Sequence, residues 1–177
     1  MKILILHGSR RRNGNTSILA DEFMRGAKEA GHDTEKVELG ALKIADCLGC
    51  SACLRNGGVC VQKDDMAQVS AKLAEADVIV LASPVYFYTW TSLMKRCLDR
   101  VYSQIAVLRG KRFYLLTAGA ADDEEYFANI LADFREYVGC FRDCTAAGYV
   151  LGIGAGEGGS IRNTPAMHEA FELGRTL

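Results

Sequence analysis

The sequence lacks an excess of either charge, and it lacks a long apolar run. Its 177 residues include 21 lysines and arginines against 22 aspartates and glutamates, which gives a formal net charge of -1. Such a balance offers no broad electrostatic attraction to nucleic acid or to an anionic membrane, so we expect neither as a partner. No apolar run approaches the about 20 residues that a membrane helix needs. We therefore expect no membrane-spanning segment.

The start of the sequence lacks the features of a secretory signal. The opening Met1-Lys2-Ile3-Leu4-Ile5-Leu6 meets Gly8 and three arginines before a signal-peptide core can form. We therefore expect a cytoplasmic protein. The seven cysteines are an odd number, and four of them lie between Cys47 and Cys60, which does not suit the disulfide framework of a secreted fold. Reduced thiols with a metal or redox role are expected instead.

Two common nucleotide-binding motifs are absent from the segment 8–17, which follows the first apolar run. Asn15 stands where a Walker loop needs lysine, and the Gly-x-Gly-x-x-Gly pattern is missing. Backbone N–H groups at a helix start, together with the hydroxyls of Ser9, Thr16 and Ser17, the Asn15 amide and an arginine, can still hold a phosphate dianion. The segment predicts a site for a terminal monophosphate, and the alternative is a solvated turn.

The order of the apolar runs predicts the fold class. Runs at 3–6, 78–82, 113–116 and 149–151 predict strands buried on both faces, and the weaker alternation at 34–39 predicts an edge strand. Because helices alternate with these strands, we expect a doubly wound α/β fold with a five-stranded parallel sheet of order 2-1-3-4-5 and helices on both faces. With 49% hydrophobic residues, the whole chain 1–177 is expected to form a single domain.

Five amphipathic helices are expected between and after these strands. Four of them are indicated by apolar stripes: Leu19, Phe23, Ala27 and Ala30; Met66, Val69, Leu73 and Ala76; Leu93, Cys97, Val101 and Ile105; and Phe127, Ile130, Phe134 and Val138. The fifth helix is expected from Thr164-Pro165 to near Gly174. A second glycine-rich stretch, 152–159, follows the last strand. It cannot open a βαβ unit, so we expect a flexible loop there and no dinucleotide site.

The loop 40–63 contains four cysteines with the spacing Cys-x2-Cys-x2-Cys-x6-Cys, namely Cys47, Cys50, Cys53 and Cys60. So long a loop in a compact domain is usually functional or disordered. The spacing places four thiolates in one loop, the first three at two-residue gaps similar to those of bacterial ferredoxin loops, and it favours a [4Fe-4S] cluster. Zinc, metal-free thiols and a disulfide remain alternatives. The other three cysteines are interpreted as small buried hydrophobic residues without a chemical role: Cys97, Cys140 and Cys144.

An aromatic group, Tyr86, Phe87, Tyr88 and Trp90, follows the third predicted strand. It is expected at the carboxyl edge of the sheet, where doubly wound folds bind ligands. Flat apolar ligands suit such walls. The alternative is that these rings pack in the core or in a subunit interface.

Three of these features together resemble a known family. Gly8-Ser9-x-x-x-x-Gly14-Asn15-Thr16, then Ser83-Pro84-Val85-Tyr86-Phe87, then Lys95 through Asp99-Arg100 resemble the NAD(P)H-dependent FMN reductases of the flavodoxin-like fold, over essentially the whole chain. The four-cysteine run and the following Lys63-Asp64-Asp65-Met66 resemble the iron-sulfur flavoproteins of that family.

The resemblance implies an FMN site and its residues. The FMN phosphate is expected at Ser9, Arg11, Asn15, Thr16 and Ser17. The isoalloxazine ring is expected to be bordered by Pro84, Val85, Tyr86, Phe87, Thr117, Ala118 and Gly119. The cluster ligands are expected to be the four cysteines of the loop.

The resemblance also implies an FMN-dependent oxidoreductase that passes electrons between FMN and a [4Fe-4S] cluster. NAD(P)H or a redox protein such as ferredoxin is the expected donor, and a homodimer or homotetramer is the expected assembly. Because the flavin carries the chemistry, we assign no catalytic side chain. Two alternatives remain: a cluster-free NAD(P)H-dependent FMN or quinone reductase, and a non-catalytic flavin-binding redox sensor.

Overall fold

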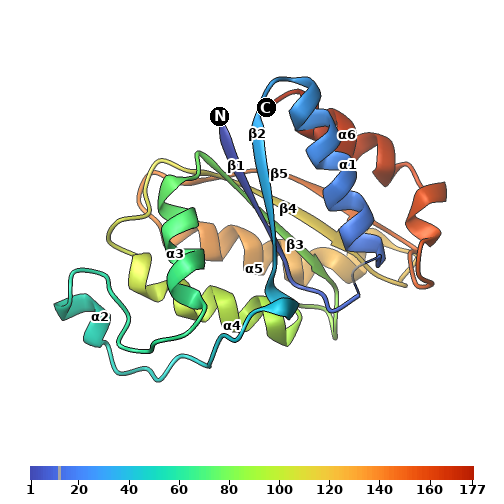
Figure 1. Ribbon diagram of the computed structural model, residues 1–177. Helices are drawn as coiled ribbons and strands as arrows, with labels where there is room; N and C mark the ends of the chain where they lie inside the picture. Colours follow the sequence, from blue (N-terminus) through green and yellow to red (C-terminus); the bar gives the residue numbers. More distant parts are fainter. Residues whose placement is uncertain (12) are drawn as a thin grey trace.

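The computed structural model describes residues 1–11 and 13–177 (Figure 1). Its sheet has five parallel strands in the order β2-β1-β3-β4-β5, which confirms the predicted fold class and strand order. The strands are β1 (Lys2–His7), β2 (Asp33–Glu38), β3 (Val78–Pro84), β4 (Arg112–Ala118) and β5 (Thr145–Gly152).

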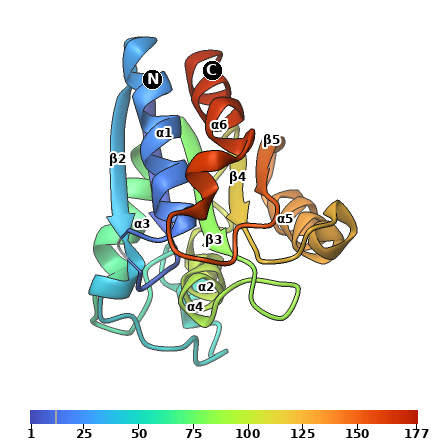
Figure 2. The same cartoon turned by 90° about the vertical axis from the view of Figure 1, so that its right-hand side faces the viewer.

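Helices cover both faces of this sheet, as Figures 1 and 2 show. One face carries α1 (Asn15–Glu29) and α6 (Ala166–Arg175), and the other carries α3 (Met66–Glu75), α4 (Ser92–Arg100) and α5 (Ala128–Gly139). The single turn α2 (Ala52–Arg55) belongs to the cysteine-rich loop, which extends beyond α3 and α4 in Figure 1. Short 3-10 helices complete the chain: η1 (Leu39–Ala41), η2 (Val101–Gln104), η3 (Glu124–Phe127) and η4 (Ser160–Asn163).

Two hydrophobic cores lie on the two sides of the sheet. Because alternate residues of a strand point to opposite faces, Leu4 and Leu6 pack with α3, α4 and α5, whereas Ile3 and Ile5 pack with α1 and α6. Both sets are buried, which explains the continuous apolar run of β1. The edge strand β2 is only half-buried, as its weaker alternation predicts.

The third predicted apolar stripe is partly wrong. The helix α4 ends at Arg100, and the chain continues as the 3-10 helix η2, so the predicted stripe does not run on in one helix to Ile105. Met94 is fully buried and Leu93 only half-buried, and Met94 faces Gly8 so closely that a Cβ on Gly8 would lie 2.8 Å from the Met94 Cβ. In the part of the chain that the structure describes, no helix is both long enough and apolar enough to cross a bilayer.

Candidate functional site

A cavity of about 170 Å³ lies at the carboxyl ends of the strands. Its walls come from the segments that follow β1, β3, β4 and β5, and Figure 2 shows these segments meeting at one edge of the sheet. The lining residues are Ser9, Arg11, Gly14, Asn15, Thr16, Pro84, Val85, Tyr86, Ala118, Gly119, Ala120, Ala155 and Gly156. Nine of them are among the residues predicted for FMN. Sequence reasoning missed Gly14, Ala120, Ala155 and Gly156.

One end of the cavity is the N-terminus of α1. Gly14 is the N-cap residue, no side chain caps the helix, and its first turn carries no acidic residue. The first turn of a helix leaves backbone N–H groups without intrahelical acceptors, and the helix dipole favours an anion at this position. Ser9, Arg11 and Thr16 line the same end. This geometry suits a phosphate group.

The Asn15 side chain contacts the segment 155–159, which follows the last strand. Its Nδ2 donates to the carbonyl oxygens of Ala155, at 2.7 Å, and Glu157, at 2.9 Å. Its Oδ1 accepts from the backbone N–H of Gly159, at 2.8 Å. The stretch predicted as a flexible loop is therefore tied to α1 and forms a wall of the cavity. Sequence patterns did not indicate this contact, because more than a hundred residues separate its partners.

A line of buried polar groups joins the carboxyl ends of three strands. The Thr91 hydroxyl donates to the Gly8 carbonyl oxygen, at 2.6 Å, and accepts from the backbone N–H of Met94, which caps α4. The Ser83 hydroxyl accepts from the backbone N–H of Thr91, and the Thr117 hydroxyl donates to the Ser83 carbonyl oxygen, at 2.7 Å. Sequence reasoning missed Thr91, although a threonine just before a helical stripe is a typical N-cap signal.

Three of the residues predicted for FMN do not line the cavity. Thr117 is fully buried and faces β3 through its bond to Ser83. Ser17 is also fully buried, and its hydroxyl accepts from the Lys36 ammonium group at 3.2 Å. Phe87 is 97% exposed and lines a neighbouring cavity. The Ser17 hydroxyl is buried because it lies on the inner side of α1, and the Thr117 hydroxyl is buried because it lies on the central strand β4.

Phe87 and Tyr88 form the tip of a tight turn beside the cavity. Tyr86 and Thr89 exchange two backbone hydrogen bonds, at 3.0 and 3.2 Å, across the turn. The central residues have φ angles of 48° and 69°, a conformation that hairpin turns usually give to Asn and Gly. Tyr88 stacks on Tyr126, with ring centroids 6.0 Å apart.

A second cavity, of about 440 Å³, lies under this turn and adjoins the first. Both cavities are lined by Val85, Gly119 and Ala120. Trp90 differs from the rings of the turn, because it is only 7% exposed and packs in the core. The aromatic group of the sequence is thus divided: Tyr86 lines the first cavity, Phe87 and Tyr88 line the second, and Trp90 packs in the core.

The four cysteines of the loop line one small cavity of about 40 Å³, together with Arg100. All four are free thiols. Gly49, Gly57 and Gly58 have positive φ angles, as expected for the tight turns of this loop. Among the residues that the structure describes, no three His, Cys, Asp or Glu side chains form a group able to hold a metal ion. The fold therefore gathers the thiols around a common space without setting them at ligand distances.

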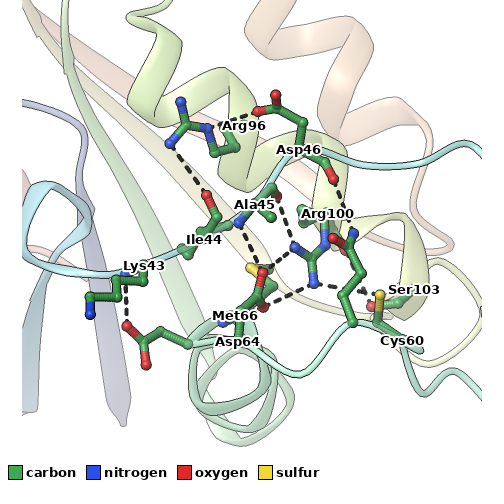
Figure 3. A network of polar contacts seen from close by, with 12 residues as sticks. Lys43, Ile44, Ala45, Asp46, Cys60, Asp64, Met66, Arg96, Arg100 and Ser103 are labelled. Atoms are coloured by element: carbon green, nitrogen blue, oxygen red, sulfur yellow. Dashed lines mark hydrogen bonds and ion pairs between the residues drawn. The ribbon is translucent and has the colours of Figure 1, made fainter.

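A buried ion pair holds the base of this loop (Figure 3). Arg100 Nη1 and Nη2 donate to the two carboxylate oxygens of Asp64, at 2.6 and 3.0 Å, and the Arg100 side chain is 1% exposed. Burial alone raises the pKa of the Asp64 carboxyl, but hydrogen bonds from Arg100 and from the backbone N–H groups of Ala45 and Met66 outweigh it and lower the pKa. Asp64 is therefore held as a carboxylate.

The three remaining cysteines have different environments. Cys97 is fully buried, and burial raises the pKa of its thiol to about 12. Cys144 is half-buried. Cys140 is exposed, so its prediction as a buried residue is wrong. It lies one position beyond the end of α5, past Val138, which is the last buried residue of that helix.

Comparison with known proteins identifies related sequences. Residues 1–130 match the family model described as NADPH-dependent FMN reductase. The chain is 34% identical over 158 residues to an iron-sulfur flavoprotein of Archaeoglobus fulgidus, a match that covers 87% of this chain and 69% of the relative. It is 26% identical over 187 residues to YwqN of Bacillus subtilis, named as an NAD(P)H-dependent FMN-containing oxidoreductase, with 98% and 96% of the two chains covered.

The chain spans about half the length of two further relatives, iron-sulfur flavoproteins of Archaeoglobus fulgidus and Methanocaldococcus jannaschii. Among solved structures, an azoreductase of Bacillus anthracis superposes with a TM-score of 0.78 at 16% sequence identity, and all of both chains is covered. At this identity the likeness establishes the fold alone.

Proposed function

The chain belongs to the NADPH-dependent FMN reductase family and is an FMN-dependent oxidoreductase, and from this premise we propose that NAD(P)H reduces FMN held in the cavity at the carboxyl ends of β1, β3 and β4. The observation that supports this position is that a helix N-terminus and the segments after two strands line the same cavity. The N-terminus of α1 offers a phosphate site, and the segments after β3 and β4 offer flat walls beside it. When bound, FMN supplies the hydride chemistry.

In this proposal the chain's own residues bind and orient the cofactor. Ser9, Arg11, Thr16 and the first turn of α1 hold the phosphate, and the Asn15 amide holds the wall 155–159 in place. The ring lies along Pro84 to Tyr86 and Ala118 to Ala120. Gly119 packs closely against Phe127, since a Cβ there would lie 3.3 Å from the Phe127 ring. The second cavity, under the turn of Phe87 and Tyr88, provides space for a flat substrate next to the ring.

We further propose that the four-cysteine loop holds a [4Fe-4S] cluster, which would accept and release single electrons. Four free thiols that line one cavity are the appropriate donor set. The names of the curated relatives support the same assignment. The flavin and cysteine cavities share no lining residue. We therefore propose a homodimer or homotetramer, in which the flavin cavity of one copy meets the cysteine cavity of another. We also propose ferredoxin as an alternative electron donor.

The experiment that tests this function is anaerobic purification followed by measurement of FMN, iron and acid-labile sulfide in one sample. About four irons and four sulfides per chain are expected with a cluster of this type. Oxidation of NADH and NADPH is then followed with FMN present, and sedimentation measures the assembly. A chain that neither contains FMN nor binds added FMN contradicts the proposed site.

A cluster-free NAD(P)H-dependent reductase is the second candidate. The specific observation that favours it is the lack, among the described residues, of a group of side chains at metal-binding spacing. The same sample distinguishes the two candidates. FMN with NAD(P)H oxidation but without iron, even after anaerobic reconstitution with iron and sulfide, supports the cluster-free reductase. FMN without turnover by any reductant supports a redox sensor.

A further inference from the structure

The two ends of the cysteine-rich loop are joined to each other at its base. The backbone N–H of Ala45 donates to Asp64 at 2.9 Å, and that of Lys43 donates to Asp65 at 2.6 Å. Farther along, the Gln62 amide donates to the Asp46 carbonyl oxygen at 3.0 Å. The segment before the first cysteine is thus paired with the segment after the last one, as Figure 3 shows for most of these residues.

Two arginines of α4 attach this base to the body of the protein. Arg96 donates to the Asp46 carboxylate, at 3.0 Å, and lies in a half-exposed position. Arg100 is buried, pairs with both carboxylate oxygens of Asp64 and also donates to the Ala45 carbonyl oxygen at 2.8 Å. Arg100 therefore contacts both ends of the loop at once, whereas Arg96 contacts only the first.

Arg100 differs from Arg96 in a second respect, because it reaches a thiol. Its Nη2 lies 3.5 Å from the Cys60 sulfur, within the range of a hydrogen bond to sulfur, and Figure 3 shows the guanidinium between Asp64 and Cys60. The Arg100 Nε is buried and has no acceptor within the described part of the chain. A buried guanidinium with an unused N–H is costly, unless a further acceptor comes to lie beside it.

We propose that Arg100 is a positioning residue for the cysteine cluster: it fixes the Cys60 sulfur and donates a hydrogen bond to it, so that the bound cluster is retained and its reduced form is favoured. The inference rests on the proposed cluster. Asp64 balances the charge of Arg100, so the pair can be buried, and it orients the guanidinium toward the sulfur. Hydrogen bonds to ligating sulfur raise the reduction potential of iron-sulfur clusters.

The test uses the anaerobically purified protein with its FMN and cluster, in three variants. Arg100→Lys keeps the charge, but one ammonium group cannot serve both Asp64 oxygens and the Cys60 sulfur in the fork geometry of a guanidinium. The double variant Arg100→Gln with Asp64→Asn removes both charges together. Arg96→Gln is the matched control, because it loosens the same loop without touching a thiol. The readouts are the rate of iron loss to a chelator and the midpoint potential of the cluster.

Both Arg100 variants are expected to lose iron at least fivefold faster than the wild type and the Arg96→Gln control. Their remaining cluster is expected to be at least tenfold harder to reduce at equilibrium, which is about 59 mV for a one-electron couple. If both variants lose iron at the wild-type rate and keep the wild-type midpoint potential, the inference is overturned. FMN content reports folding, and if the double variant does not bind FMN, Arg100→Lys alone decides.

The failure of the inference differs visibly from the failure of the proposed cluster. If the wild type takes up no iron after anaerobic reconstitution, the cluster assignment is wrong and the role of Arg100 falls with it. If the wild type contains the cluster and both Arg100 variants match its iron loss and midpoint potential, the cluster assignment stands and only the role of Arg100 is rejected.

Discussion

Gly26 of α1 and Gly174 of α6 form a reciprocal close contact between the two helices. A Cβ on Gly26 would lie 2.1 Å from the Phe171 carbonyl oxygen, and a Cβ on Gly174 would lie 2.1 Å from the Phe23 carbonyl oxygen. Each helix therefore accepts the other's backbone only where a side chain is absent. This contact determines how α6 packs beside α1, whose N-terminus forms one end of the cavity.

Gly26→Ala is accordingly expected to lower the free energy of unfolding by about 3 kcal/mol, because the helices must separate to admit the methyl group. The measurement is urea denaturation followed by far-UV circular dichroism. The matched control is Gly139→Ala at the end of α5, where an added Cβ meets nothing within 4 Å. There alanine should raise the stability by about 0.5 kcal/mol. Equal effects at the two positions contradict the close contact.

Asn15→Ala is expected to release the segment 155–159. Loss of its hydrogen bonds, each worth about 1 kcal/mol, should speed amide hydrogen exchange in that segment, and because the segment forms a wall of the cavity, it should weaken FMN binding about tenfold. Asn129→Ala, an exposed change on α5, is the control and should alter neither property. Weaker FMN binding with unchanged exchange would instead indicate a direct contact between the Asn15 amide and the phosphate.

Phe87→Asn is expected to stabilise the protein by about 1 kcal/mol, because asparagine tolerates the left-handed backbone better than phenylalanine does. Phe87 is 97% exposed, so little packing is lost in the single chain. Phe87→Leu retains the strain and serves as control. Strained residues persist at binding sites, and we therefore expect KM for the flat substrate to rise in Phe87→Asn. The prediction fails if the Asn and Leu variants have the same urea midpoint.

Acid sensitivity is expected from Asp64. Its folded-state pKa is lowered, so its contribution to stability is complete above the unfolded-state pKa and is lost as the pH falls toward the folded-state value. Asp64→Asn should lower stability at pH 7 by about 3 kcal/mol, because Arg100 is left buried without its partner. The variant should then lose less stability than the wild type between about pH 5 and 3. Denaturant midpoints measured across this range compare the two, and parallel curves contradict the assignment.

Thiol labelling should separate Cys97 from Cys140. Burial and the raised thiol pKa of about 12 protect Cys97 from iodoacetamide in the folded protein, whereas Cys140 is exposed. Peptide mass spectrometry after brief labelling is expected to find Cys140 modified and Cys97 unmodified. In urea both should react, which controls for intrinsic reactivity. Labelling of Cys97 at the rate of Cys140 without denaturant argues against its burial.

The strands and most helices were predictable because their signals are local. Continuous apolar runs at 3–6 and 78–82 reflect strands covered on both faces, and alternation with helical stripes leads to a parallel sheet of known handedness. The Asp64-Asp65 start signal places the helix α3 at its observed beginning, where the Asp64 carboxylate accepts from the backbone N–H of Met66 at 3.1 Å. Each of these features depends on residues only a few positions apart.

The lining of the cavity was predictable where its residues lie at a strand end or in the segment 8–17. Pro84 ends β3, Val85 and Gly119 come immediately after buried strands, and all three line the cavity. Thr117 and Ser17 have suitable side chains at nearby positions, but one residue along a strand or helix changes the side that a group faces, and both are buried.

The sequence by itself determined the doubly wound sheet, the flavin family and the presence of four thiols in one loop, because spacing along the chain specifies each of them. Tertiary structure alone decided that Asn15 holds the wall 155–159, that Thr91 joins the loops after β1 and β3, and that Arg100 reaches Cys60. These contacts connect residues 40 to 140 positions apart. A hydrogen bond of that span exists only when the sheet brings its partners together, and no periodic pattern records it.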